Sequence, residues 1–313
     1  MLSTGAGDLQ SVTASTAAGK AMFKTEPTMY ALGPEGTFCE LAAQQVLGRF
    51  KLAWPTQYCP TLEATVVAAA KHRDGMATAP IENSRTGTVA AVQDAILSAD
   101  VRIIGELNLT VRFNCLANAP LAAVRRVFVQ PVAEAQCLEF LAGLSSAEIV
   151  TVRSNADALA RLEALERADE PTAAIVPSHC ERNGHFQVIR NVQTGESNVT
   201  RFLALKSAAT APELDYAMPK TSIVLEPRAN RPGLLREILE PFERFGVNVC
   251  RLESRPSEDL WSYRFFLDLI SPEGQRGSHY SVQGVPAALR DLEAKGVDVR
   301  VLGNYASLAP LTA

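Results

Sequence analysis

The sequence predicts an open α/β region followed by a ferredoxin-like βαββαβ module, and three observations lead to this fold class. The chain has 313 residues, 47% of them hydrophobic, which is enough to build cores for two domains. From Met29 to Leu205, apolar strand-like segments alternate with amphipathic helix-like segments. After a small, proline-containing segment at 206–220, the order changes to βαββαβ over roughly 90 residues.

Each predicted element follows from its periodicity and its flanking turn residues. Residues 1–28 are small and polar, and we interpret them as a disordered tail rather than a signal peptide or membrane span. In the α/β region we predict strands at 29–33, 76–84, 101–117, 124–130, 148–154, 172–177 and 202–205, and helices at 38–50, 63–73, 90–99, 132–144 and 155–168. In the second region, 221–313, we predict strands at 221–227, 247–256, 261–270 and 297–305, and helices at 232–246 and 285–296.

Composition excludes several classes of function. The net charge of −4 and the 20% of charged residues offer no basic surface for nucleic acid or for an acidic membrane. The six cysteines form no C-x-x-C pair, so neither a disulfide framework nor a zinc cage is indicated. His179, Cys180 and His185 lie near one another in the sequence, but no second pair completes a metal site. We therefore expect a cytoplasmic protein that acts on a small molecule without metal or cofactor.

The stretch GPEGTFCE, Gly33 to Glu40, follows the first predicted strand. Thr37 and Glu40 have the spacing of a capping box, in which the two side chains bind the first amides of a helix. The same helix start could also bind an anion at the carboxyl edge of a sheet. The two interpretations are compatible.

A second polar loop, PIENSRTGTV, also follows a predicted strand. Its hydrogen-bonding side chains are Glu82, Asn83, Ser84, Thr86 and Thr88. They could simply satisfy the backbone of the loop, as asparagine and serine commonly do. Alternatively, two such loops at neighbouring strand ends would form a cleft that holds carboxylates without a metal.

Thr200 and Arg201 in NVTRF stand immediately before the apolar run Phe202 to Leu205. Together with GPEGTFCELAA, PIENSRTGTV and, far downstream, LESRP, this motif occurs in the order and spacing of the bacterial prephenate dehydratase family, which the chain resembles from Met29 to about Ser307. The resemblance implies a two-lobed catalytic domain like a periplasmic binding protein at 29–205, a linker at 206–220, and an ACT regulatory domain at 221–313. Because no mutase-like helical domain precedes Met29, a stand-alone dehydratase is expected.

The resemblance also implies a reaction, the decarboxylative dehydration of prephenate to phenylpyruvate in phenylalanine biosynthesis. Thr200 matches the catalytic threonine of the family and would donate a hydrogen bond to the departing ring oxygen. Thr37, Asn83 and Ser84 are candidates for holding the substrate carboxylates or keto group. Arg201 either binds a substrate carboxylate or joins the two lobes through backbone carbonyls.

The C-terminal region contains two motifs that correspond to the phenylalanine-binding motifs of the family. Gly233 and Leu234 lie in RPGLLREI, and Glu253, Ser254 and Arg255 lie in LESRP. A glycine there allows the effector to approach the backbone closely. Without the resemblance, the same residues indicate a helix start and an ordinary strand end.

A homodimer or homotetramer is expected, because a four-stranded sheet leaves an edge strand that can pair with a second copy.

The chain departs from the family pattern at several positions. They are Cys39 in place of serine, Gln130 in place of histidine, Thr194 in place of aspartate, and Cys250 in place of a hydroxyl residue. The loss of ionisable groups leaves the preference between prephenate and arogenate open. Two further alternatives remain, a prephenate decarboxylase relative and a binding protein without turnover that senses amino acids.

Overall fold

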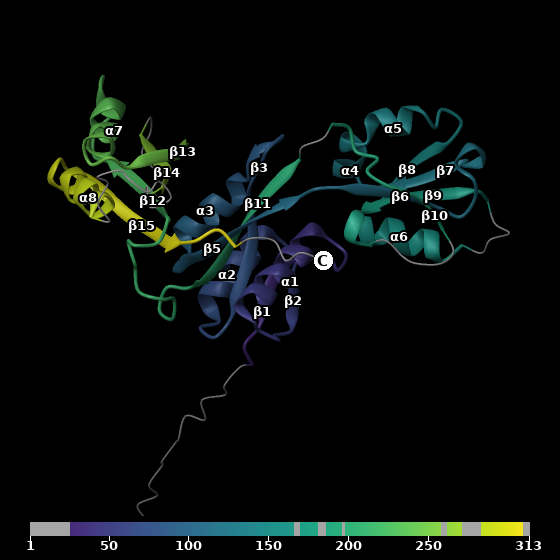
Figure 1. Ribbon diagram of the computed structural model, residues 1–313, viewed down its shortest axis with the longest axis horizontal. Coiled ribbons are helices and arrows are strands. Elements are labelled where there is room, and N and C mark those ends of the chain that lie inside the picture. The colour runs from purple at the N-terminus through teal and green to yellow at the C-terminus, as the bar shows by residue number, and fades with distance from the viewer. Residues whose placement is uncertain are drawn as a thin grey trace, which may run out of the picture.

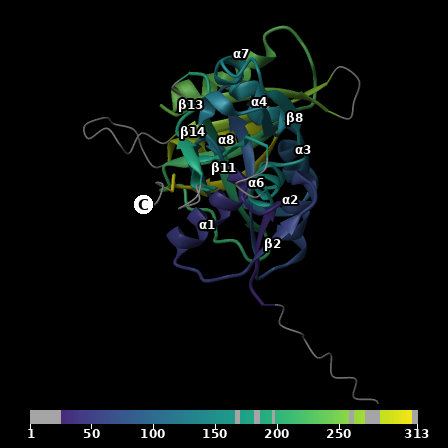
Figure 2. The ribbon, with the colours of Figure 1, turned by 90° about the vertical axis from the view of Figure 1, so that its right-hand side faces the viewer.

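A computed structural model describes residues 26–165, 170–180, 186–195, 198–257, 262–270 and 283–308. Figure 1 shows three bodies in a row, namely a first lobe in the centre, a second lobe to the right, and a C-terminal domain to the left. Figure 2 views the same molecule from the second-lobe end. Within the described residues, no helix has the length and apolar character needed to cross a bilayer.

The first lobe is a mixed sheet with strand order β2-β1-β3-β11-β5, and β4 pairs with β3. Its strands are β1 Met29–Leu32, β2 Thr56–Cys59, β3 Met76–Asn83, β4 Gly87–Thr88, β5 Val101–Thr110 and β11 Val199–Ser207. Its helices are α1 Phe38–Phe50, α2 Leu62–Lys71 and α3 Ala90–Ser98. Strand β11 returns to this sheet after the chain has passed through the second lobe, and it lies antiparallel between β3 and β5.

The second lobe is a five-stranded sheet with order β10-β6-β9-β7-β8. Its strands are β6 Phe113–Ala117, β7 Arg126–Val129, β8 Glu148–Thr151, β9 Thr172–Pro177 and β10 Gln187–Ile189. Its helices are α4 Pro131–Gln136, α5 Leu138–Ala142 and α6 Asn155–Glu163, with short 3-10 turns η1 Leu121–Ala123 and η2 Ser178–Cys180. The chain passes between the lobes in the short segment between β5 and β6, and again between β10 and β11.

The C-terminal domain has the predicted βαββαβ order. Its elements are β12 Lys220–Pro227, α7 Leu234–Arg244, β13 Asn248–Pro256, β14 Tyr263–Ile270, α8 Gly284–Ala294 and β15 Val297–Tyr305. The strand order β13-β14-β12-β15 is that of a ferredoxin-like sheet. One buried cluster joins α7 and α8 to the sheet through residues such as Ile223, Phe242 and Leu289.

A second hydrophobic core is shared between the C-terminal domain and the first lobe. Val224, Phe266 and Leu302 of the C-terminal sheet belong to the same buried cluster as Ile81 and Leu203 of the first lobe. Strand β15 crosses β5 so closely that a Cβ built on Gly303 would lie 2.1 Å from the carbonyl oxygen of Ile103. The domains therefore touch through packed apolar surface at a position that requires glycine.

The predicted fold class, a two-lobed α/β domain followed by a ferredoxin-like domain, is confirmed, but several element boundaries differ. The predicted strands at 101–117 are β5 and β6, which belong to different lobes. The predicted helix at 132–144 is two short helices, and β2 and β10 were not predicted. Strand β11 continues to Ser207 and β12 begins at Lys220, so strand residues extend into both ends of the expected linker.

Candidate functional site

Thr200 and Asn83 form a cross-strand pair on β11 and β3, near the end of both strands. The side-chain amide nitrogen of Asn83 donates a hydrogen bond to Thr200 Oγ1 at 2.8 Å. Thr200 is 9% exposed, so its hydroxyl lies in a mostly dry environment. The structure thus brings together two residues that are 117 positions apart in the sequence and that were both predicted as site residues.

The backbone of the β3–β4 turn fixes the orientation of the Asn83 amide. Its oxygen accepts hydrogen bonds from the backbone nitrogens of Arg85 at 3.0 Å and Thr86 at 3.1 Å. The nitrogen must therefore be the atom that faces Thr200. Since Thr200 Oγ1 accepts from Asn83, the hydroxyl hydrogen of Thr200 is left to donate to another acceptor.

Asn198 and Gln136 extend this network into the second lobe. The Asn83 amide nitrogen also donates to Asn198 Oδ1 at 2.7 Å, and the Asn198 amide nitrogen donates to Gln136 Oε1 at 2.6 Å. Gln136 is the last residue of α4, so the chain of amides connects the two lobes beside Thr200. Neither residue was predicted as a site residue, although Asn198 lies within the NVTRF motif.

Ser84 and Thr37 stabilise the backbone next to this network. The Ser84 hydroxyl oxygen accepts from the backbone nitrogen of Val199 at 3.0 Å. Thr37 is the N-cap of α1, where it accepts from the backbone nitrogen of Glu40 at 3.3 Å, and Glu40 accepts from Gly36 at 2.6 Å. The threonine half of the predicted capping box is present, but the Glu40 carboxylate accepts from the residue before the N-cap instead of from the N-cap itself. Because β1 and β3 are parallel neighbours, Thr37 and Ser84 follow their carboxyl ends at one sheet edge.

The start of α1 also contacts the second lobe. The Phe38 ring packs edge-on against the rings of Phe113 and His179, and the Cys180 thiol donates to the Gly36 carbonyl oxygen at 3.2 Å. Burial lowers the pKa of His179, which outweighs the opposing effect of the Glu40 carboxylate. The two lobes therefore meet at the helix terminus that was predicted to face an anion.

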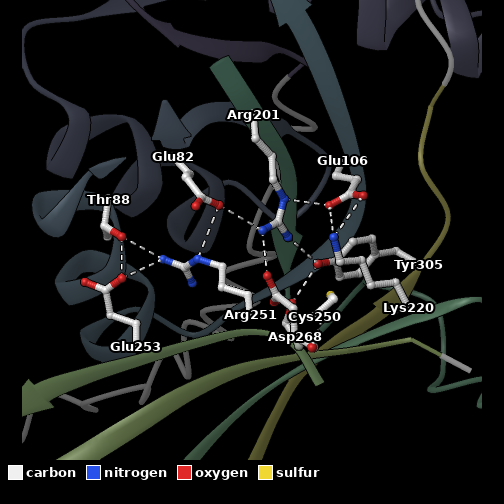
Figure 3. Close-up of polar contacts among 11 residues, drawn as sticks. Glu82, Thr88, Glu106, Arg201, Lys220, Cys250, Arg251, Glu253, Asp268 and Tyr305 are labelled. Carbon is white, nitrogen blue, oxygen red and sulfur yellow. Dashed lines mark hydrogen bonds and ion pairs between the residues drawn. The ribbon is translucent and has the colours of Figure 1, made fainter. Parts of the chain in front are cut away.

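Arg201 lies in a buried polar cluster at the contact with the C-terminal domain (Figure 3). Its Nε is 2.6 Å from Glu106 Oε2, its Nη1 is 2.5 Å from Asp268 Oδ2, and its Nη2 donates to the Tyr305 hydroxyl at 3.0 Å. Lys220 Nζ contacts the same Glu106 oxygen at 2.8 Å. The Arg201 side chain therefore does not lie with the side chains of Asn83 and Thr200. It connects the first lobe to the C-terminal domain through carboxylates, whereas the alternative prediction was a connection between the two lobes through backbone carbonyls.

Electrostatic interactions favour the charged forms of Arg201 and Asp268. Burial opposes the charge of Arg201, but Asp268, Tyr305 and Glu106 outweigh it and raise the pKa of the guanidinium. Burial would likewise raise the pKa of Asp268, but the charge and hydrogen bonds of Arg201 and the Ser222 hydroxyl hold that pKa below its ordinary value.

The four departures from the family pattern differ in their surroundings. Gln130 is the N-cap of α4, and its side-chain oxygen accepts from the backbone nitrogens of Val132 at 3.0 Å and Ala133 at 3.2 Å. Burial raises the pKa of Cys39 to about 12, so its thiol stays neutral. The Thr194 carbonyl accepts from the Arg85 guanidinium, and the Cys250 thiol lies 3.2 Å from the Asp268 carbonyl oxygen.

The predicted effector residues lie on two elements of the C-terminal domain. Gly233 precedes α7 with a left-handed φ of 83°, and Leu234 shares a small pocket with Phe265. Phe265 pairs with Ser254 of β13. The other two residues of the motif contact the first lobe, since Glu253 accepts from the Thr88 hydroxyl and Arg255 Nη2 is 2.7 Å from Asp94 Oδ2.

A protein-family model described as prephenate dehydratase matches residues 29–210, which span both lobes and the Asn83–Thr200 pair. The chain belongs to the prephenate dehydratase family. A curated prephenate dehydratase from Mycolicibacterium smegmatis is 33% identical over 291 residues, covering 89% of this chain and 90% of that protein.

Solved structures are similar to this chain over most of its length. A prephenate dehydratase from Arthrobacter aurescens in complex with L-Phe has a TM-score of 0.72 and 29% identity, covering 91% of this chain and 92% of that one. A structure described as a novel type of quorum-quenching acylase has a TM-score of 0.71 and 25% identity, covering 90% and 97%. The prephenate dehydratase fold is thus shared with a protein described by a different activity.

Proposed function

We propose that this chain is a prephenate dehydratase that converts prephenate to phenylpyruvate in L-phenylalanine biosynthesis and is regulated by phenylalanine. The observation that supports this most directly is the Asn83–Thr200 hydrogen bond, which leaves the Thr200 hydroxyl hydrogen free to act as a donor. The same geometry does not suit an activated nucleophile. Such a hydroxyl needs an adjacent acceptor for its proton, whereas Asn83 presents a donor.

In the proposed reaction, the bond between the ring and its carboxylate breaks and carbon dioxide leaves. The electron pair of that bond enters the ring, and the carbon–oxygen bond on the opposite side breaks. The departing hydroxide takes up a proton and leaves as water. Thr200 donates a hydrogen bond to this oxygen while negative charge develops on it. Because the threonine hydroxyl is a weak acid, it does not stay ionised: it relays a proton that the solvent supplies, and one proton is consumed for each water released.

The substrate carboxylates would be held at the sheet edge where β1 and β3 end. We place one against the α1 terminus at Thr37, where helix amides and the positive end of the dipole favour an anion. Ser84 would orient another polar group of prephenate. Asn83 would act on the substrate through Thr200, because both hydrogens of its amide already donate within the protein. We assign Arg201 to the domain contact instead of the substrate, because its side chain is 11% exposed and paired with two carboxylates.

The product of prephenate turnover tests this function. Purified protein is incubated with prephenate and the product is identified by mass spectrometry and ultraviolet absorbance. Phenylpyruvate is expected. A hydroxylated dihydro keto acid would indicate a decarboxylase, and no product would indicate a binding protein without turnover. A parallel reaction with arogenate decides between the two substrates. A cytoplasmic location is part of the same proposal.

Phenylalanine is proposed to bind near Gly233, Leu234, Glu253, Ser254 and Arg255. We expect Gly233→Val to abolish the effect of phenylalanine on turnover while basal turnover stays largely intact. The left-handed φ of Gly233 strains a β-branched residue, and the added side chain blocks close approach to the backbone. Binding is measured by calorimetry and inhibition by prephenate turnover.

A matched control is Gly296→Val. Gly296 has a similar φ of 80° in the same domain, and a Cβ there meets nothing within 4 Å. This variant should therefore keep its response to phenylalanine. If phenylalanine inhibits the Gly233 variant as strongly as the wild type, the effector site lies elsewhere.

We also propose a homodimer or homotetramer. Strand β13 is an edge of the C-terminal sheet, and Leu252 on it and Tyr263 on the adjacent β14 are 41% and 40% exposed. A sheet edge that exposes apolar side chains is commonly covered by pairing with a second copy. Light scattering should show a mass at least twice 33.7 kDa at working concentration. A single species of monomer mass, with and without phenylalanine, would contradict the proposal.

A further inference from the structure

Two consecutive cross-strand pairs on β3 and β11 have their side chains on opposite faces of the sheet. Thr200 is opposite Asn83, and the next pair along the strands is Arg201 opposite Glu82. Neighbouring residues of a strand point to opposite faces of the sheet. The first pair therefore belongs to the proposed substrate site, whereas the second faces the C-terminal domain, as Figure 3 shows for Arg201 and Glu82.

Both members of the second pair have an ion-pair partner in the C-terminal domain. Arg201 Nη1 is 2.5 Å from Asp268 on β14, and Glu82 Oε2 is 3.3 Å from Arg251 Nε on β13. Arg201 and Glu82 are themselves 3.7 Å apart. The strand segments that carry Thr200 and Asn83 are thus each attached to the C-terminal domain at the adjacent residue.

The attachment through Arg201 is rigid. The side chains of Arg201 and Asp268 are only 11% and 6% exposed, so separating them would leave two charges with little water to solvate them. Asp268 also accepts a hydrogen bond from the Ser222 hydroxyl, and Ser222 is 2.6 Å from the Tyr305 hydroxyl, which itself contacts Arg201. A closed network of this kind fixes the direction of the guanidinium.

We propose that Arg201 is a positioning residue that sets the orientation of the Thr200 hydroxyl. We further propose that the Arg201–Asp268 pair is the connection through which the C-terminal domain controls turnover. A movement of β14 displaces Arg201, and because Thr200 is the preceding residue on the same strand, the donor moves with it. This inference rests on the proposed dehydratase function.

The test uses Asp268→Asn in the full-length protein, which removes the charge but keeps the shape of the side chain. We expect kcat to fall about tenfold or more, because a displacement of about 1 Å can cost a hundredfold in rate. KM should stay within about twofold, since substrate contacts are unchanged. Inhibition by phenylalanine should be largely lost.

Asp94→Asn is the matched control. It makes the same chemical change in another ion pair between the domains, Arg255 Nη2 to Asp94 Oδ2 at 2.7 Å. The Asp94 side chain on α3 is 57% exposed and is paired with Arg255 and not with a residue of the two pairs on β3 and β11, so basal kcat should be unchanged. Hydrogen exchange supplies a readout independent of turnover, because amides of residues 199–203 should exchange faster in Asp268→Asn than in Asp94→Asn.

A double-variant cycle separates coupling from independent effects. If Arg201 acts through Asp268, Arg201→Gln combined with Asp268→Asn should lower kcat about as much as either change alone. If the double variant instead lowers kcat by the product of the two single effects, the inference is wrong. It is also wrong if folded Asp268→Asn has a normal kcat and a normal response to phenylalanine. Should Asp268→Asn fail to fold, Tyr305→Phe removes only one contact of Arg201 and must lower kcat without raising KM. If the wild type does not turn over prephenate but residues 199–203 still exchange faster in Asp268→Asn, the dehydratase function is wrong, while the connection from Asp268 to the Thr200 strand remains supported.

Discussion

Thr200→Ala is expected to lower kcat for prephenate about a hundredfold to a thousandfold, which is the usual cost of removing a donor that acts in the transition state. The alanine variant loses the hydroxyl that Asn83 orients at 2.8 Å. KM should change much less, because we propose that other groups bind the substrate carboxylates. Steady-state kinetics with prephenate, read as phenylpyruvate formation, measures both constants.

Thr200→Ser is the control for this variant. Serine keeps the hydroxyl and the hydrogen bond from Asn83 but loses the methyl group, so kcat should stay within about tenfold of the wild type. Circular dichroism and the thermal midpoint establish that both variants are folded. Near-normal turnover by folded Thr200→Ala would show that another group assists the departure of the ring oxygen.

Arg201→Met is expected to lower the free energy of unfolding by about 3–5 kcal/mol at neutral pH, the range found when one partner of a buried ion pair is removed. The substitution leaves Asp268 buried without its guanidinium, while Glu106 retains Lys220 at 2.8 Å. Urea unfolding of wild type and variant measures the difference. A loss of less than about 1 kcal/mol would show that the cluster contributes little to stability.

The deficit of Arg201→Met should also depend on pH. In the wild type the pKa of Asp268 is depressed, so its contribution to stability is complete above the ordinary carboxyl pKa, about 3.9, and is lost as pH falls through the lower folded value. In the variant, burial is no longer opposed by Arg201 and the pKa rises. The deficit is therefore largest near pH 7 and shrinks as pH approaches about 4. A deficit that stays constant over this range would indicate lost packing rather than an unpaired charge.

Periodicity predicted much of the fold because most elements have one buried face. It did not separate β5 from β6, since one alternation of apolar and polar residues runs through most of 101–117 without a break, and the change of lobe occurs at Val111 and Arg112 within it. It also missed β2 and β10, which are short strands at the edges of their sheets. Edge strands bury little surface, so they leave a weak pattern.

The candidate site was predicted only where a motif contains it. Asn83 and Thr200 lie in motifs, but Gln136 joins them through a contact across 62 residues that no local pattern encodes. The partners of Arg201 did leave a signal that was not used. Glu106 and Asp268 are each the single carboxylate of their strand and are each followed by a leucine, and a buried carboxylate requires a cation.

The core shared by the first lobe and the C-terminal domain bears on how such a protein could be assembled in evolution. A regulatory module acquired by gene fusion would need only a linker if it made no packed contact with the catalytic part. Here Gly303 and Phe266 of the module fit against Ile103 and Ile81 of the catalytic part, so a foreign module of the same fold would meet an unmatched surface. The two parts are therefore expected to be inherited and exchanged together, with substitutions on one side of the contact accompanied by substitutions on the other.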